Sequence, residues 1–263
     1  MLDSGGPLNS FTQHRPNILA TLKWMAGADS LQGLRPNNED RFLIDPGLSC
    51  FVVADGMGGH EAGEEASLLA LRTIHKSLQN QTTNQAGQSI LAQGLDQANQ
   101  AILSAGQAFG HRRMGTTIVI LAKVGVTWWI ANLGDSEAWL FRKGKKIILS
   151  HAHNMAAELV RQKAMAPKEA AHSPLKHRLV RYLGSYELKE PNCFYSDIRP
   201  FQPKPGDALL LGTDGLMDHI NDAQIRALLG KGLDPQTMVQ ELTREALQQG
   251  SPDNVTGLLV QFF

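Results

Sequence analysis

The stretch that decides the fold of this chain is Cys50-Phe-Val-Val-Ala-Asp-Gly-Met-Gly-Gly-His60. Its first five residues are apolar without a break, which predicts a short buried strand. The glycines that follow predict a tight turn. Over residues 62–78 the apolar residues return at helical spacing and predict an amphipathic helix. The segment is therefore predicted to form a strand, a turn and a helix, with Asp55 where the strand ends.

Similar apolar or β-branched runs recur along the chain, with turn residues between them. They predict strands over residues 42–44, 50–54, 117–122, 127–132, 138–142, 146–149, 193–198, 208–212 and 256–262. Gly144 lies in a charged turn and predicts a hairpin between the strands on either side of it. Helical spacing predicts three more helices, over residues 89–108, 223–229 and 235–248. Because strands and helices do not alternate strictly, we expect antiparallel sheets with helices packed outside them, an α+β layered sandwich.

Length and composition limit the possible classes. The chain has 263 residues, enough for a substantial core, and no Pro-, Gly- or Ser-rich linker divides it, so we expect a single domain. Lys and Arg number 25 and Asp and Glu also number 25, so no overall field recruits nucleic acid or a membrane surface. Only two cysteines are present, and no segment approaches the ~20 apolar residues that span a bilayer. A cytoplasmic monomer without nucleic-acid or membrane partners is expected.

Two segments differ from the rest of the chain. Residues 1–21 contain several glycines and prolines, and we expect an N-terminal extension that is either a mobile arm or a strand captured by the core. Residues 22–263 are expected to form the folded domain. Within it, residues 151–190 are polar and basic and are broken by Pro167, Pro174 and Gly184, which predicts a flap with short helical pieces. Its basic residues fit either substrate contact or a solvated surface.

Four aspartates lie at the ends of predicted strands, in the pairs Asp55-Gly56, Gly134-Asp135, Asp214-Gly215 and Asp253-Asn254. Taken singly, each pair is explained as a turn, because Asp and Gly both favour turns. When several such strand ends converge, their carboxylates and nearby backbone carbonyls form a hard oxygen site. The pattern therefore predicts a site for magnesium, manganese or calcium.

A second polar segment, Arg35-Pro-Asn-Asn-Glu-Asp40, precedes the first predicted strand. It places a guanidinium within a few residues of two carboxylates. Arg35 can hold phosphate oxygens in a bidentate manner, and Glu39 can contribute to the shell of a metal ion, often through water. A surface salt bridge explains this segment equally well when it is taken alone. Beside the aspartates, the segment suits a phosphate bound next to metal ions.

The order and wording of these motifs resemble the metal-dependent protein phosphatases of type 2C, in particular the compact bacterial members of that family. The motifs are Gly33-Leu-Arg-Pro-Asn-Asn-Glu-Asp40, Val53-Ala-Asp-Gly-Met-Gly-Gly-His60, Met114-Gly-Thr-Thr117, Asn132-Leu-Gly-Asp-Ser136, Gly212-Thr-Asp-Gly-Leu216 and Ser251-Pro-Asp-Asn-Val-Thr256. Each motif is weak alone, but six in the family's order form a specific signal. The resemblance implies a four-layer α-β-β-α sandwich of two antiparallel sheets, and one phosphatase catalytic domain over residues 22–263.

The resemblance also implies a metal centre in a channel at one edge of the sandwich. The implied ligands are Glu39, Asp55, Gly56, Asp135, Asp214 and Asp253. Asp55 would bridge two ions, Mn²⁺ or Mg²⁺, with Glu39 and the carbonyl of Gly56 completing one shell. Asp214 and Asp253 would hold the other ion, and Asp135 would help Asp214 to hold a third, weaker one.

Further, the resemblance implies catalytic roles for Arg35 and Asp40. Arg35 would bind the substrate phosphate, and Asp40 would orient Arg35 or a metal-bound water. The reaction would be hydrolysis of phosphoserine or phosphothreonine in a protein, by direct attack of a water that bridges the two ions. Bacterial relatives usually oppose Ser/Thr kinases, so a kinase is the expected counterpart.

Three positions depart from the family's pattern. Met57 stands where many eukaryotic relatives have a histidine, which excludes general acid catalysis from that position. Glu137 stands where an arginine is common, and Ala152 where an aspartate is common before His153. His60, in a glycine-rich turn, is interpreted as a structural hydrogen-bonding residue and is not included in the catalytic set.

Two other functions remain open at the level of sequence. A pseudophosphatase would keep the fold as a binding module, but the retained carboxylates of Asp55, Asp214 and Asp253 disfavour it. A phosphohydrolase that acts on small metabolites is compatible with the motifs, because a metal site recognises the phosphate more than the molecule that carries it.

Overall fold

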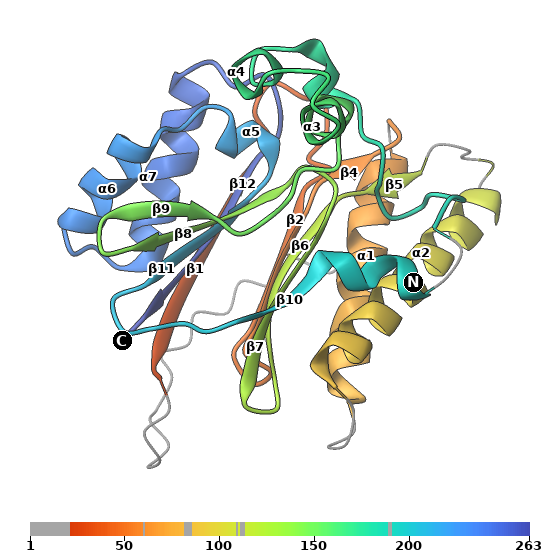
Figure 1. Cartoon of the computed structure of the whole chain (residues 1–263), viewed down its shortest axis with the longest axis horizontal. Helices are drawn as coiled ribbons and strands as arrows, with labels where there is room; N and C mark the ends of the chain where they lie inside the picture. Colours follow the sequence, from red (N-terminus) through yellow and green to blue (C-terminus); the bar gives the residue numbers. More distant parts are fainter. Residues whose placement is uncertain (1–21, 60, 82–85, 109, 111–113, 189–190) are drawn as a thin grey trace, which may run out of the picture.

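The computed structural model describes residues 22–59, 61–81, 86–108, 110, 114–188 and 191–263. The predicted N-terminal extension and His60 lie outside these residues. Two five-stranded antiparallel sheets pack face to face, and helices cover their outer faces (Figure 1). The predicted α+β, four-layer α-β-β-α sandwich is confirmed.

The first sheet has the strand order β1-β12-β11-β8-β9. The bounds are β1 Trp24–Leu31, β12 Val255–Phe262, β11 Ala208–Gly212, β8 Glu137–Arg142 and β9 Lys145–Ile148. The predicted hairpin at Gly144 joins β8 to β9. Strand β1 was not predicted; it pairs with β12 along its whole length, from Trp24 opposite Phe262 to Leu31 opposite Val255. Gly27 interrupts its apolar pattern because a Cβ there would overlap the backbone of Gln236 in helix α7.

The second sheet has the strand order β10-β7-β6-β3-β2. The bounds are β10 Ile198–Phe201, β7 Thr127–Leu133, β6 Ile118–Val124, β3 Cys50–Ala54 and β2 Arg41–Asp45. The strand predicted over residues 193–198 is wrong, because the 3-10 helix η2, Pro191–Asp197, occupies that segment and β10 begins only at Ile198. A short apolar run does not distinguish a strand from a helical turn, and a proline at the first position favours the turn.

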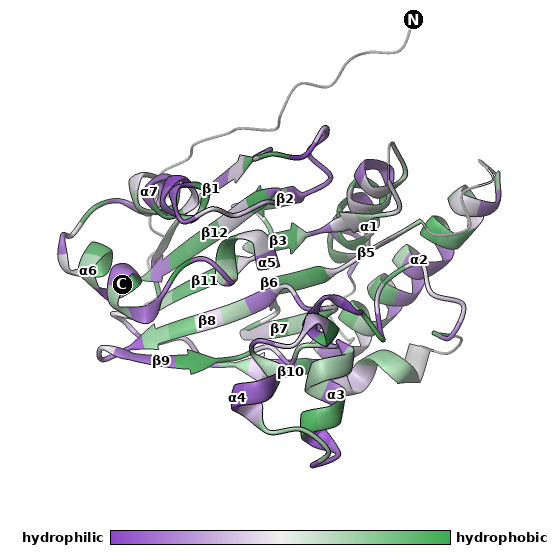
Figure 2. Cartoon of the chain, turned by 90° about the horizontal axis from the view of Figure 1, so that it is seen from above, coloured by the Kyte–Doolittle hydropathy of each residue, from purple (hydrophilic) through white to green (hydrophobic). Residues whose placement is uncertain are grey.

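The core fills three layers, and β3 contacts two of them. Phe51 and Val53 point into the layer between the sheets, whereas Cys50, Val52 and Ala54 point into the layer under the helices. This double burial explains why the strand is apolar without a break. Figure 2 shows the strands of both sheets as largely hydrophobic bands between the helices.

Each sheet has its own helical cover. Helices α1 (Glu61–Gln79) and α2 (Gly87–Ala108) pack on the second sheet. Helices α5 (Asp214–Met217), α6 (Asp222–Gly230) and α7 (Pro235–Gln248) pack on the first. The four predicted helices are thus confirmed, and α5 is an additional short one. In the part of the chain that the structure describes, no helix is long and apolar enough to cross a membrane.

The predicted flap leaves the first sheet after β9 and contains the expected short helical pieces. These are α3 (Met155–Arg161), α4 (Pro167–Ala170) and the 3-10 helix η1 (Pro174–His177). A two-stranded sheet of β4 (Gly56–Met57) and β5 (Gly115–Thr116) lies at the same end of the molecule (Figure 1). The flap meets it through a β-bridge between Leu183 and Thr116.

Candidate metal centre

The four predicted aspartate pairs meet at the edge of the sandwich that carries the flap (Figure 1). Asp55 lies between β3 and β4, and Asp135 lies in the turn after β7. Asp214 is the first residue of α5, and Asp253 lies just before β12. Neighbouring strand ends therefore bring together carboxylates that are distant in the sequence.

Electrostatics show how closely these groups are gathered around Asp55. The pKa of Asp55 is raised well above its ordinary value, first by burial and then by the charges of Asp40, Asp214, Asp135 and Asp253. These residues thus form one acidic cluster, in which Asp40 is buried and the other four are partly exposed. At neutral pH such a cluster needs a cation or bound protons to offset its charge.

Asp40 belongs to this cluster and is fixed by hydroxyl groups. Thr213 Oγ1 donates a hydrogen bond of 2.9 Å to Asp40 Oδ2. Burial raises the pKa of Asp40 to about 7, although the hydrogen bonds from Thr256 and Thr213 lower it. The side chain is only 2% exposed, so it is held rigidly at the base of the cluster.

The pKa values of Asp135 and Asp214 are raised in a similar way. Burial, and then the charge of Asp214, raise the pKa of Asp135 to about 7. Burial also raises the pKa of Asp214, and the charges of Asp253 and Asp218 add to this effect. His177 of the flap partly offsets them, since its Nδ1 lies 3.7 Å from Asp214 Oδ2.

Glu39 is positioned by Gly56 in β4 and by Gly63 near the start of α1. Its carbonyl oxygen accepts hydrogen bonds from Gly56 N, at 3.2 Å, and from Ser67 Oγ, at 2.7 Å. Its carboxylate lies over Gly63, where a Cβ would overlap Glu39 Oε2. The sequence analysis missed Gly63, and the available signal was a glycine inside an otherwise helical pattern.

Arg35 lies at the rim of the cluster, where its Nη2 donates a hydrogen bond of 2.6 Å to Asp253 Oδ2. The guanidinium is about half exposed, with 54% of the side chain accessible. It does not bond to Asp40, which accepts from Thr213 instead. One face of Arg35 is therefore available to an incoming anion at the mouth of the site.

Asn254 ties the segment that carries Arg35 and Glu39 to the start of β12. Its Oδ1 accepts a hydrogen bond of 2.9 Å from Glu39 N, and its Nδ2 donates to the carbonyl oxygens of Gln32 and Asn37 at 2.7 and 2.9 Å. The sequence analysis quoted Asn254 within a motif but gave it no role. Its contacts depend on pairing between β1 and β12, which sequence alone did not predict.

His153 of the flap clamps the turn that presents Asp135. Its backbone N–H donates to Gly134 O at 2.9 Å, and its Nδ1 accepts from Gly134 N at 3.2 Å. Because Nδ1 is an acceptor, the ring proton is on Nε2, which faces Asp197 Oδ1 at 3.2 Å. Arg181 pairs with the same carboxylate at 2.8 Å. These two basic residues of the flap are therefore structural.

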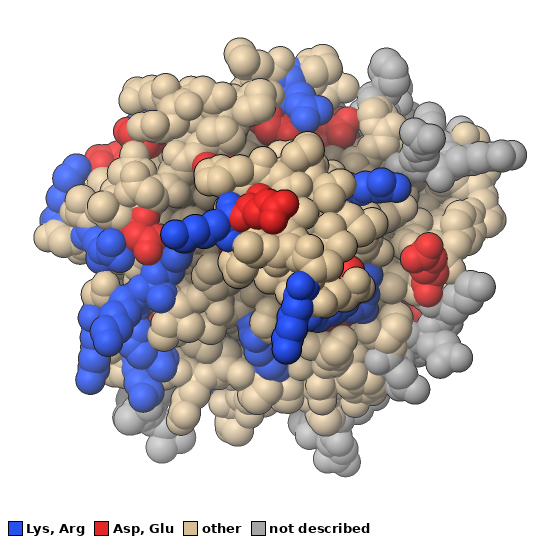
Figure 3. All heavy atoms as spheres, turned by 45° about the horizontal axis from the view of Figure 1, so that its top comes forward, with Lys and Arg blue, Asp and Glu red and all other residues tan. Residues whose placement is uncertain are grey.

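A cavity of about 410 Å³ separates the flap from the acidic edge. Its polar lining includes Asp135, Asp214 and Asp218, and the flap supplies an apolar wall that is rich in alanine. Lys176 of the flap spans to Asp218 with an ion pair of 2.8 Å. Figure 3 shows this end of the molecule, where Lys and Arg project and several Asp and Glu are visible only in hollows.

The residue types of the cluster fit divalent cations. Carboxylate and carbonyl oxygens are the ligands that Mg²⁺, Mn²⁺ and Ca²⁺ prefer. Burial and mutual repulsion raise the pKa values of the carboxyl groups, and a cation would reverse that effect. The candidate ligands Asp55, Asp135, Asp214 and Asp253 are brought together, with Glu39 and Gly56 in contact at one side.

Comparison with known proteins identifies the family to which this chain belongs. The family model described as Protein phosphatase 2C matches residues 27–255. The chain belongs to the protein phosphatase 2C family. It is 31% identical over 232 residues to Protein phosphatase PhpP of Streptococcus pneumoniae serotype 2, an alignment that covers 86% of this chain and 92% of that protein. The resemblance inferred from the motifs is thereby confirmed.

Solved structures of bacterial phosphatases share the fold of this 2C-family chain. The Mycobacterium tuberculosis serine/threonine phosphatase PstP/Ppp has a TM-score of 0.80 at 27% identity, over 92% of this chain and 99% of that one. A structure of the PstP catalytic domain in complex with two manganese ions has a TM-score of 0.78 at 28% identity, with the same coverage. The 2C family is metal dependent, and the acidic edge is where this chain gathers oxygen ligands.

Proposed function

We propose that this 2C-family chain is a metal-dependent protein phosphatase that hydrolyses phosphoserine and phosphothreonine. The observation that carries the proposal is the convergence of Asp55, Asp135, Asp214 and Asp253, with the buried Asp40 behind them, at one partly exposed edge. The similarity to bacterial serine/threonine phosphatases supports the substrate class. A cysteine nucleophile has no part in this proposal, and Cys50 is buried in β3.

We assign the metal ligands as the motifs imply. Asp55, Glu39 and the carbonyl of Gly56 would hold one ion, and Asp214 and Asp253 would hold a second with Asp55 shared between them. When bound, two divalent cations lower the pKa of a water that they share and neutralise charge on the phosphate. Manganese or magnesium would serve, and Asp135 with Asp214 would hold a third ion.

Arg35 would bind the phosphate of the substrate. Its guanidinium already lies beside the candidate ligand Asp253, so a phosphate held there would face the metal edge. Asp40 would act indirectly, because it is buried and bonded to Thr213 rather than to Arg35. It would keep the surrounding ligands in place and add negative charge behind them.

The cavity beneath the flap would receive the polypeptide around the phosphorylated residue. It opens beside Asp135 and Asp214, and its alanine-rich wall suits a small apolar side chain. We further propose that residues 22–263 act as one catalytic domain, that the chain is a cytoplasmic monomer, and that a bacterial Ser/Thr kinase supplies its substrates. The shared core between the two sheets supports the single domain.

The test is release of phosphate from a phosphothreonine peptide, measured for wild type and Asp214→Asn across Mn²⁺ and Mg²⁺ titrations. Wild-type activity should require metal, and the variant should lose about a hundredfold or more of kcat/KM. Glu187→Gln, which changes an acidic residue of the flap outside the cavity lining, is the matched control and should keep full activity.

Other results would support the other functions. A wild type that binds phosphopeptide but releases no phosphate at any metal concentration would indicate a binding module. Hydrolysis of small phosphate esters that phosphopeptides fail to inhibit would indicate a metabolite phosphohydrolase.

A further inference from the structure

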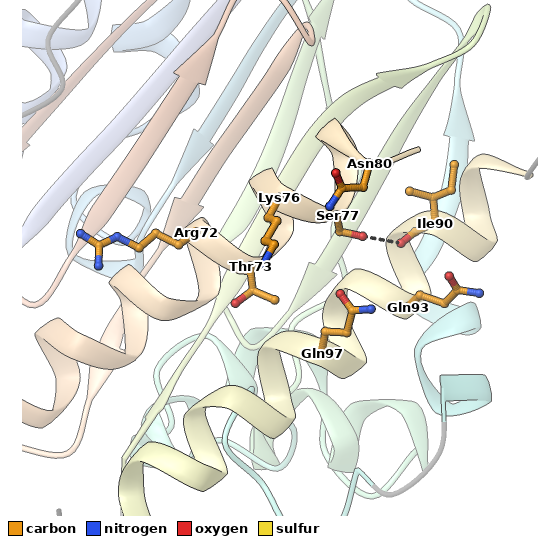
Figure 4. A pocket seen from close by; sticks show the side chains of 8 residues that line it. All are labelled: Arg72, Thr73, Lys76, Ser77, Asn80, Ile90, Gln93 and Gln97. Atoms are coloured by element: carbon orange, nitrogen blue, oxygen red, sulfur yellow. Dashed lines mark hydrogen bonds between the residues drawn. The ribbon is translucent and has the colours of Figure 1, made fainter. Parts of the chain in front are cut away.

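A second hollow lies on the helical cover of the second sheet, between α1 and α2 (Figure 4). Its volume is about 610 Å³. We call it the helix groove and define it by Arg72, Lys76, Ser77, Asn80, Gln93 and Gln97. None of these residues takes part in the metal centre described above.

The helix groove is positively charged. Arg72 and Lys76 are exposed and lie four residues apart, so they occupy the same side of α1. Neither forms an ion pair with any residue that the structure describes. Among the residues that the structure describes, no Asp or Glu lines the groove, in contrast to the acidic cavity beneath the flap. The charge therefore suits an anionic ligand.

The shape and the neutral lining suit an extended polypeptide. Gly94 brings the two helices close at the base of the groove, where a Cβ would lie 3.1 Å from Ile74 Cδ1 and from Ser77 Oγ. Ser77 Oγ donates to Ile90 O at 3.5 Å and so closes this base (Figure 4). Gln93 and Gln97 extend from α2, and their amides can pair with main-chain N–H and C=O groups.

Helix α1 connects the groove to the metal centre. Gly63, near its start, lies against Glu39, and Arg72 and Lys76 follow on the same helix. At 1.5 Å per residue they lie roughly 14 and 20 Å from Gly63 along the helix axis. An extended chain covers such a span in about four to six residues, at roughly 3.3 Å per residue.

We propose that the helix groove docks an acidic segment of the phosphoprotein substrate, located about four to six residues from the phosphorylated residue. The inference rests on the proposed phosphatase function and adds a sequence preference to it. Arg72 and Lys76 pair with the acidic side chains, while the glutamines of α2 bind the main chain. Docking lowers KM and leaves kcat unchanged, because the groove is remote from the reacting phosphate.

The test compares two phosphothreonine peptides. One carries four Glu residues that begin five residues from the phosphothreonine, and the other carries four Gln residues at the same positions. A short phosphopeptide and p-nitrophenyl phosphate report the activity of the metal centre alone. The variants are Arg72→Glu/Lys76→Glu and the milder Gln93→Glu. The matched control is Lys143→Glu/Lys145→Glu, which makes the same charge change at the exposed turn between β8 and β9.

For wild type, KM for the Glu peptide should be about three- to tenfold below that for the Gln peptide, as two exposed ion pairs would give. Arg72→Glu/Lys76→Glu should abolish this difference, and Gln93→Glu should reduce it. The control pair should retain it, and all variants should hydrolyse the short substrates normally. Raising the salt concentration should shrink the difference.

Equal KM values for the two peptides in wild type, or an equal loss in the control pair, would overturn the proposal. A separate measurement keeps it distinct from the phosphatase assignment. Fluorescence anisotropy of an unphosphorylated Glu-rich peptide reports docking without catalysis, and binding that Arg72→Glu/Lys76→Glu abolishes supports the groove. Failure of wild type on every phosphorylated substrate would instead count against the proposed function.

Discussion

The layer between the two sheets is buried and the acidic edge of the same sandwich is partly exposed, and different forces act in them. Between the sheets, Phe51 meets the rings of Trp24 and Trp128 at centroid distances of 4.8 and 6.3 Å. The buried residues that pack there are apolar, and their burial stabilises the fold. At the edge, burial first and the charges of neighbouring carboxylates second raise the pKa of Asp40 and of Asp135 to about 7.

This difference separates the source of stability from the source of function. The layer between the sheets stabilises the fold whether or not a ligand is bound. Crowded carboxylates at the edge oppose folding, so the geometry of the edge depends on the strands that end there. Removing apolar volume should therefore cost stability, whereas changing the edge should alter metal binding first.

The largest expected effect is on the apolar layer. Phe51→Ala should lower the free energy of unfolding by about 3–5 kcal/mol, because Phe51 is fully buried and its removal leaves a cavity. Urea denaturation measures this loss. Phe263→Ala is the control, since that ring is 52% exposed and should cost less than about 1 kcal/mol. Equal losses would show that the layer is not the main source of stability.

The second prediction concerns metal and pH. In the metal-free protein the pKa of Asp40 and that of Asp135 are about 7 when folded and near 3.8 when unfolded. The folded state thus holds extra protons between these values, so stability should fall as pH rises from about 4 to 7. Mn²⁺ at a hundred times its Kd should restore about 2.7 kcal/mol at neutral pH. At the same Mn²⁺ concentration, thermal denaturation should show less stabilisation by Mn²⁺ at pH 5 than at neutral pH. Equal stabilisation at both pH values would contradict the coupling between metal binding and deprotonation of these carboxyl groups.

A third prediction tests the support of Glu39. Gly63→Ala should weaken Mn²⁺ binding about 10- to 100-fold, because the added Cβ overlaps the carboxylate of Glu39 and the backbone of Gly56. Isothermal titration calorimetry gives the affinity directly. Gly230→Ala, at the end of α6, has open space around its Cβ and should leave the affinity unchanged. Unchanged Mn²⁺ affinity in Gly63→Ala would show that Gly63 does not support metal binding through Glu39.

The smallest expected effect is at the far end of β2, where a carboxylate is paired instead of crowded. His75 Nε2 lies 2.6 Å from Asp45 Oδ2. Burial is the largest influence and raises the pKa of Asp45, but the hydrogen bond and charge of His75 and the backbone N–H of Leu48 together outweigh it, so the net pKa is lowered. Asp45→Asn should cost about 1 kcal/mol at neutral pH. The cost should disappear as pH falls through the lowered pKa of Asp45, and urea denaturation of wild type and variant across that pH range measures it.

The sequence allowed most of the fold to be predicted, because its strands are short apolar runs and its helices keep a clear period. The exceptions depend on distant contacts. Residues 24–31 become a strand by pairing with β12, at the other end of the chain. Residues 193–197 turn into a helix where Asp197 binds His153 and Arg181. Neither the pairing of β1 with β12 nor the contacts of Asp197 can be predicted from the local pattern of apolar residues.

The candidate site was predictable to a similar depth. Aspartates beside glycine at strand ends are visible in the sequence, and the structure brings them together. Residues that act through others were not visible in this way. Gly63 matters because the carboxylate of Glu39 lies against it, and Asn254 matters because it forms hydrogen bonds with three backbone groups. Such roles follow from geometry and have no motif that marks them.

Strand β12 has a consequence for the order in which the chain is made. It is the last strand, it lies between β1 and β11, and Asp253 and Asn254 come just before it. During translation, β1 has no strand to pair with until β12 has been synthesised. A chain without residues 253–262 therefore lacks the central strand between β1 and β11 and also lacks a complete acidic edge. The order of synthesis thus delays assembly of the acidic edge until the residues that precede and form β12 have been made.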